Sequence, residues 1–79
     1  MQTIREMAIE CLKDFTEVTL NFSDDTECTI GEAGNYLGGG DGYISEVLGN
    51  ISYDTAESAV DATINYMKRN KATLIDFNS

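Results

Sequence analysis

The sequence predicts a small α+β domain: a helix, a three-stranded antiparallel meander and a second helix, with both helices on one face of the sheet. The apolar residues recur three and four apart near both ends of the chain and two apart between them, which are the periods of helices and of strands. Turn-forming residues separate the alternating stretches. A length of 79 residues allows a single domain, residues 1–79, with a thin core.

The first helix is predicted over residues 2–15. Its apolar residues, spaced three and four apart, form one stripe along a helix, and charged residues lie opposite. We expect the stripe to face the core. Its members are Ile4, Met7, Ala8, Cys11, Leu12 and Phe15.

Strand-like alternation begins after this helix. Apolar residues alternate with polar ones over 17–22 and again over 27–30, on either side of a turn at 23–26. The stretch EAGNYLGGGDGY follows, and its glycines predict a wide, mobile hairpin connection. Residues 43–53 are predicted as a third strand, with Tyr43, Val47, Ile51 and Tyr53 on one face. The alternative is a short helix over 43–48 that Gly49 stops.

The second helix is predicted to begin at a capping box formed by Asp54 and Glu57 and to run to about Asn70. Basic residues near its end suit the negative end of the helix dipole. The apolar residues of the remaining tail predict either a fourth strand or a packed segment. The expected inward residues of the helix are Ala56, Val60, Thr63, Ile64 and Met67; the apolar residues of the tail are Leu74, Ile75 and Phe77.

The residue types argue against catalysis, metals and cofactors. The chain has no His to activate Cys11 or Cys28, and both cysteines lie on predicted core faces, so we expect two buried thiols. The acidic residues fit no EF-hand spacing, and the glycine run fits no phosphate-binding motif. We therefore expect a protein that is not an enzyme and carries no cofactor.

Charge is the most informative property of the sequence. The net charge is −9, which disfavours direct binding to nucleic acid. From Asp14 to Asp61 the chain has eleven carboxylates and no Lys or Arg. Ordinary surfaces intersperse the two signs, because a single-sign field destabilises the fold. Such a stretch can serve solubility alone, or it can offer carboxylates where a basic protein expects phosphates.

The second interpretation defines a set of candidate partner-binding residues. It contains carboxylates of the acidic stretch and two tyrosines as aromatic anchors, although tyrosines in this stretch could equally belong to the core. The candidates are Asp24, Asp25, Glu27, Glu32, Tyr36, Asp41, Tyr43, Glu46, Asp54, Glu57 and Asp61. The N-terminus lacks the pattern of a secretory signal and no apolar run is long enough to span a membrane, so we expect a cytoplasmic location and no membrane partner.

The size, the acidic middle and the predicted element order resemble small phage-encoded inhibitors of bacterial defence, including anti-CRISPR proteins and other DNA mimics. This resemblance implies that the carboxylates of residues 24–61 occupy the surface of a basic nucleic-acid-binding protein or ribonucleoprotein in the bacterial host, with a CRISPR effector as the expected target. The segment GNISYDTAESAVDATINYM is similar to Hic-type antitoxin domains. The alternatives are therefore an antitoxin or immunity protein that neutralises a basic nuclease, and an acidic accessory protein without an inhibitory role.

Overall fold

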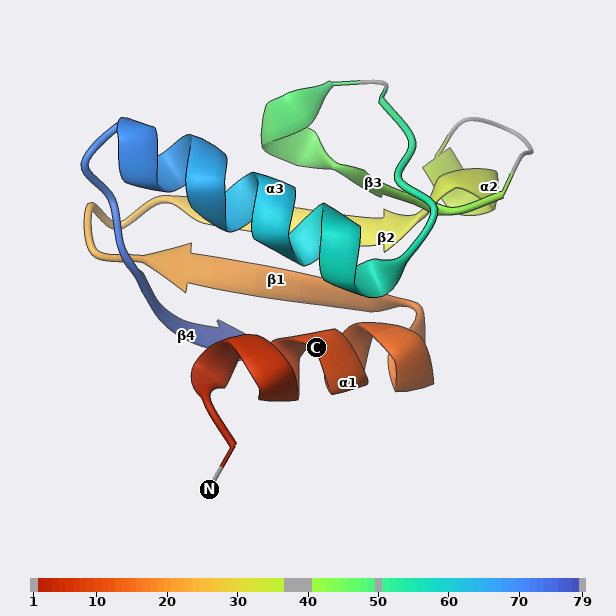
Figure 1. The fold of residues 1–79 in the computed structure, drawn as a ribbon, viewed down its shortest axis with the longest axis horizontal. Coiled ribbons are helices and arrows are strands. Elements are labelled where there is room, and N and C mark those ends of the chain that lie inside the picture. Colours follow the sequence, from red (N-terminus) through yellow and green to blue (C-terminus); the bar gives the residue numbers. More distant parts are fainter. Residues whose placement is uncertain (1, 37–40, 50, 79) are drawn as a thin grey trace.

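The computed structural model describes residues 2–36, 41–49 and 51–78. In chain order the elements are α1 (Ile4–Phe15), β1 (Glu17–Phe22), β2 (Glu27–Glu32), α2 (Ala33–Tyr36), β3 (Tyr43–Ser45), a 3₁₀ helix η1 (Glu46–Leu48), α3 (Ala56–Arg69) and β4 (Leu74–Asn78) (Figure 1). The predicted α+β class and its helix, meander, helix order are confirmed. The tail forms a fourth strand, one of the two alternatives that the sequence left open.

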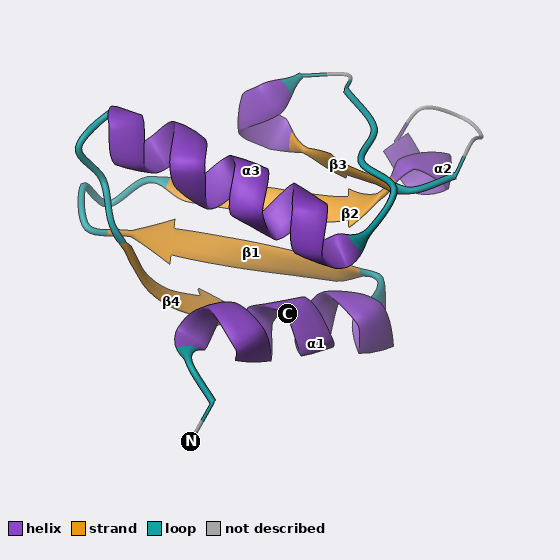
Figure 2. Ribbon diagram, viewed as in Figure 1, coloured by secondary structure: helices purple, strands orange, loops and turns teal. Residues whose placement is uncertain are grey.

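The four strands form one antiparallel sheet in the order β3-β2-β1-β4. β1 and β2 are joined by the predicted tight turn, while β4 returns from the other end of the chain to pair with β1. Both long helices lie on the same face of this sheet (Figure 2). α1 packs over β1 and β4 and against α3, and α3 packs over β3. The core lies between this helix pair and the sheet.

The core follows the alternation predicted for the strands. Val18, Leu20 and Phe22 of β1 are fully or almost fully buried, and so are Cys28 and Ile30 of β2. Both cysteines are buried and neither forms a disulfide, as expected. The other buried apolar residues of the main cluster come from the two long helices and the turn after α3: Ala8, Ile9, Cys11, Leu12, Ala56, Ala59, Val60, Met67 and Ala72.

The predicted stripe of α1 is wrong at two positions. Met7 is 37% exposed and Phe15 is 66% exposed, whereas Ile9, outside the stripe, is buried. The buried face of α1 is turned toward Ile9 because α3 packs on that side of the helix. Phe15 is the last residue of α1, where Thr16 takes a left-handed conformation and turns the chain into β1.

The third strand is much shorter than predicted. β3 ends at Ser45, and η1 follows up to Gly49, whose φ is +75°. This arrangement combines the two sequence alternatives, since a strand is followed by a helical turn that stops at Gly49. The strand ends because the Glu46 carboxylate accepts from the backbone N–H of Thr29 at 3.2 Å and takes the place of a backbone partner. Ile51, predicted to face the core, is 57% exposed.

The connection before β3 is partly helical. α2 covers Ala33–Tyr36, and residues 37–40, where mobility was predicted, lie outside the described residues. Gly42 follows with φ +91°, and a Cβ there would lie 2.3 Å from the Tyr53 carbonyl oxygen. Tyr43 and Tyr53 exchange two backbone hydrogen bonds of 2.7 Å, which closes the segment between them into a loop.

The start of α3 differs by one residue from the predicted capping box. Thr55 is the N-cap, and its hydroxyl oxygen accepts from the backbone N–H of Ser58 at 3.0 Å. Asp54 precedes the cap, so it does not fill the role assigned to it. The predicted inward residues of the helix are otherwise confirmed: Ala56, Val60, Thr63 and Met67 are buried, and Ile64 packs against the core from a half-buried position.

Candidate protein-interaction surface

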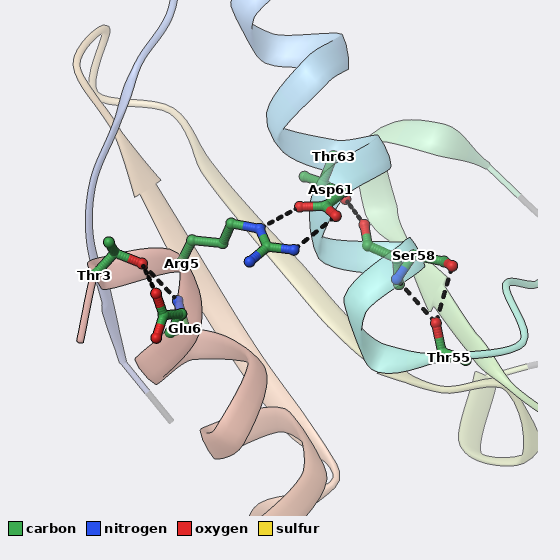
Figure 3. Close-up of polar contacts among 8 residues, drawn as sticks. Thr3, Arg5, Glu6, Thr55, Ser58, Asp61 and Thr63 are labelled. Atoms are coloured by element: carbon green, nitrogen blue, oxygen red, sulfur yellow. Dashed lines mark hydrogen bonds and ion pairs between the residues drawn. The ribbon is translucent and has the colours of Figure 1, made fainter.

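Two ion pairs join α1 to α3. The Arg5 guanidinium contacts the Asp61 carboxylate in a bidentate manner, with Nε donating to Oδ1 at 2.5 Å and Nη2 to Oδ2 at 2.9 Å (Figure 3). Lys13 Nζ lies 2.6 Å from Glu57 Oε1. The hydrogen bond from Arg5 lowers the pKa of Asp61, and the contact with Glu57 raises the pKa of Lys13. Two predicted partner-binding carboxylates therefore hold the helices together.

The other cations lie near the turn between β1 and β2. Lys68 and Arg69 end α3, and Lys71 follows. The segment after them is bonded to Ser23: the Ser23 N–H donates to the Thr73 carbonyl at 2.8 Å, and the Thr73 N–H donates to the Ser23 hydroxyl oxygen at 3.0 Å. The same end of the molecule therefore carries this basic segment and the turn with two further predicted site residues (Figure 1). Those residues are Asp24 and Asp25.

The fold divides the charges between two parts of the molecule. We define the helix layer as residues 4–15 and 56–71, which hold all five basic residues and five acidic ones, so this layer is neutral. The whole net charge of −9 therefore comes from the rest of the chain, and none of the four described strands contains Lys or Arg. The nine carboxylates are Glu17, Asp24, Asp25, Glu27, Glu32, Asp41, Glu46, Asp54 and Asp76.

The sheet face opposite the helices carries polar side chains on β1, β2 and β4. They are the residues that alternate with the buried ones, because successive strand side chains point to opposite faces. The Thr19 and Thr29 hydroxyls lie 3.0 Å apart, and the Asn21 amide donates to the Asn78 side chain at 3.4 Å. We call this set the acidic sheet surface. It consists of Glu17, Thr19, Asn21, Glu27, Thr29, Asp76 and Asn78.

The register places two carboxylates of this surface in one row. Asn21 pairs with Glu27 on one side and with Asp76 on the other. Since neighbouring strands lie about 4.8 Å apart, the Glu27 and Asp76 backbones are separated by about 10 Å. Of this pair, Glu27 was predicted from the sequence. Asp76 was missed because the candidates were drawn from residues 24–61. Its position between two apolar residues fits the strand that was one of the two alternatives for the tail.

The remaining candidates lie apart from this row. Glu32 is exposed at the end of β2, and the Asp41 carbonyl accepts from the Ser52 hydroxyl at 2.7 Å. Tyr43 is partly buried against the core, which gives it a structural role. The side chain of Tyr36 lies outside the described residues. The positions of Glu46 at the end of β3 and of Asp54 before α3 are given above.

Comparisons with protein-family models, with curated proteins and with solved structures found no match to this chain. Within residues 2–36, 41–49 and 51–78, no helix is long and apolar enough to cross a membrane. In the same part of the chain, no group of three or more His, Cys, Asp or Glu side chains is arranged to hold a metal ion.

Proposed function

We propose that this protein is a non-enzymatic inhibitor that binds a basic, nucleic-acid-handling protein of bacterial defence through its acidic sheet surface, in the manner of anti-CRISPR DNA mimics. The observation that carries the proposal is the division of charge: the helix layer is neutral, while the rest of the chain carries the entire net charge of −9. Charge that serves only solubility needs no particular location on the fold, so this division favours the proposal over that alternative.

The physical argument concerns the field on one side of the molecule. Glu27 and Asp76 lie on the same face in one row, and the strands beneath them contain no cation. A surface of one sign steers a partner of the opposite sign and raises its association rate. A groove lined with Lys and Arg to hold a phosphate backbone is such a partner. Carboxylates that occupy this groove would exclude the nucleic acid.

A pair of matched charge reversals tests the proposal. Glu27→Lys alters the acidic sheet surface, and Glu6→Lys makes the same change in net charge on α1; both side chains are exposed. The partner is captured from a bacterial lysate on the immobilised protein and identified by mass spectrometry. Its binding to each variant is then measured at several salt concentrations. We expect Glu27→Lys to weaken binding about tenfold, mainly through slower association, and Glu6→Lys to change it little.

Competition completes the test. DNA or RNA that the partner binds should displace the parent protein. Equal binding of both variants together with no competition by nucleic acid would refute the proposal. A partner that is a basic nuclease encoded beside this chain would support the antitoxin or immunity alternative instead.

A further inference from the structure

The sheet has two edges, and they differ in how far the described chain covers them. On the β3 side, Tyr53 bonds to Tyr43 through two backbone hydrogen bonds. On the other side, β4 pairs with β1, and no second strand lies against it in the described part of the chain. An uncovered edge presents backbone donors and acceptors to which another strand can bind.

The hydrogen-bond pattern shows which backbone groups of β4 face outward. Phe22 donates to Thr26 and accepts from Asp25, so its backbone groups point toward β2. Alternate residues of a strand point to opposite neighbours, and Asn21 therefore points toward β4, where it pairs with Asp76. By the same alternation, Phe77 directs its N–H and C=O away from β1, to the open edge.

The flank of α1 beside this edge is acidic and partly apolar. Arg5 and Lys13 bind α3, so they mark one side of α1. Met7, Glu10 and Asp14 recur three and four apart on the opposite side, and all three are exposed. Because α1 packs over β1 and β4 while α3 packs over β3, the side of α1 away from α3 faces the β4 side of the sheet.

The other flank of the edge belongs to β4 itself. Asp76 is exposed on the sheet face away from the helices. Ile75 is the extra residue of the bulge between the Asn21 and Phe22 pairs, and it is 53% exposed. A strand placed along β4 would thus meet carboxylates on both faces and two exposed apolar side chains, Met7 of α1 and Ile75 at the bulge. The nearest cation in the sequence, Lys71, precedes the strand at the end away from Phe77.

We propose that the outer edge of β4 binds an extended, Lys- or Arg-containing segment of a partner protein by strand addition. Charge complementarity selects this occupant, since the flanks hold Glu10, Asp14 and Asp76 and no described cation lies on them. A second copy of the chain would bring the same carboxylates together, with a net charge of −9 on each molecule. The proposal deepens the proposed function, on which it rests for the positive charge of the partner.

A synthetic peptide probes the edge directly. The probe is a fluorescent decapeptide that alternates lysine with valine, and the control is the same peptide with its six central backbone amides N-methylated. The two carry the same charge, but the control cannot pair as a strand. We expect N-methylation to weaken binding at least tenfold, because at least two backbone hydrogen bonds are lost. Hydrogen exchange followed by NMR should show protection of the Phe77 amide only with the unmodified peptide.

Matched protein variants locate the site. Asp76→Lys should weaken binding of the unmodified peptide several-fold more than Glu32→Lys, which makes the same charge change at the far end of β2. Equal affinity for both peptides, no binding of either, an unprotected Phe77 amide, or a dimer formed by the parent protein in sedimentation would each overturn strand addition. The proposed function is judged separately, by competition between nucleic acid and the captured partner.

Discussion

At the scale of single residues, the start of α3 shows how one position decides a cap. Thr55 and Asp54 are adjacent and both have side chains that suit an N-cap, but only the Thr55 hydroxyl accepts from the backbone of Ser58. We expect Thr55→Ala to lower the free energy of unfolding by about 1 kcal/mol and Asp54→Ala by about 0.5 kcal/mol or less. Urea unfolding followed by circular dichroism measures both, and a larger loss for Asp54→Ala would contradict the assignment.

Two features of the structure require glycine at position 42: its positive φ and the close approach of the Tyr53 carbonyl. A methyl group there would lie 2.3 Å from the Tyr53 carbonyl oxygen, whereas one at Gly49 would meet nothing within 4 Å. Gly49 has φ +75° and ψ −144°, a combination that almost only glycine adopts, so Gly49→Ala should cost about 1–3 kcal/mol for the backbone conformation alone. Gly42→Ala should cost more, because the bonds between Tyr43 and Tyr53 must shift. Equal unfolding midpoints in urea would show that the loop relaxes without loss.

At the scale of elements, the Arg5–Asp61 contact between α1 and α3 makes stability depend on pH. The pKa of Asp61 is lowered in the folded protein, so its stabilisation is present above the ordinary carboxyl pKa of 3.8 and is lost as pH falls through the lower folded value. The side chains are 43% exposed, so solvent screening limits the contribution to below about 1 kcal/mol. We expect Asp61→Asn to be less stable than the parent at pH 7 and nearly equal to it near pH 2.

Thermal unfolding from pH 7 to pH 2 measures this difference. A difference in melting temperature between the parent and Asp61→Asn that stays constant from pH 7 to pH 2 would show that the side chain acts through packing rather than through charge. Asn65→Asp, an exposed position on the same helix, serves as the control for a carboxylate on α3.

The elements themselves could largely be predicted, because their apolar spacing is local information. The sequence indicated α1, β1, β2 and α3 within a few residues of their observed bounds. The third strand was overextended because its end depends on Glu46, a side chain that bonds to a different strand. The buried side of α1 was predicted wrongly at Met7 for a related reason. Which side is buried depends on where α3 packs, and the spacing of residues along one helix does not predict a tertiary contact.

At the scale of the whole molecule, the sequence indicated the amount of acidic charge but not its location. The acidic stretch from Asp14 to Asp61 contains no Lys or Arg. Its last two carboxylates nevertheless form ion pairs with cations that precede the stretch in sequence, Glu57 with Lys13 and Asp61 with Arg5. The acidic sheet surface instead gains Asp76, which lies outside the stretch. The surface of a folded chain is assembled from segments far apart in sequence, so a linear run of charge does not define a face.

The net negative charge outside the helix layer predicts a salt effect on stability. Nine carboxylates lie there, and salt at 0.1 M shortens the range of the repulsion between like charges to about 10 Å. We expect the melting temperature to rise from 10 to 150 mM NaCl. The rise should be smaller in a Glu27→Gln, Asp76→Asn double variant. A melting temperature that falls with salt would mean that the ion pairs of the helix layer outweigh the repulsion.

The strand order also bears on how the chain folds while it is being synthesised. β1 lies in the interior of the sheet, but its neighbour β4 is the last element to be synthesised. One edge of β1 therefore has no partner strand until the end of the chain has been made. Long-range pairing of this kind slows folding, since a loop of some fifty residues must close before the contact forms. A chain in which β4 has not yet docked would therefore leave the edge of β1, rather than that of β4, open to unintended partners.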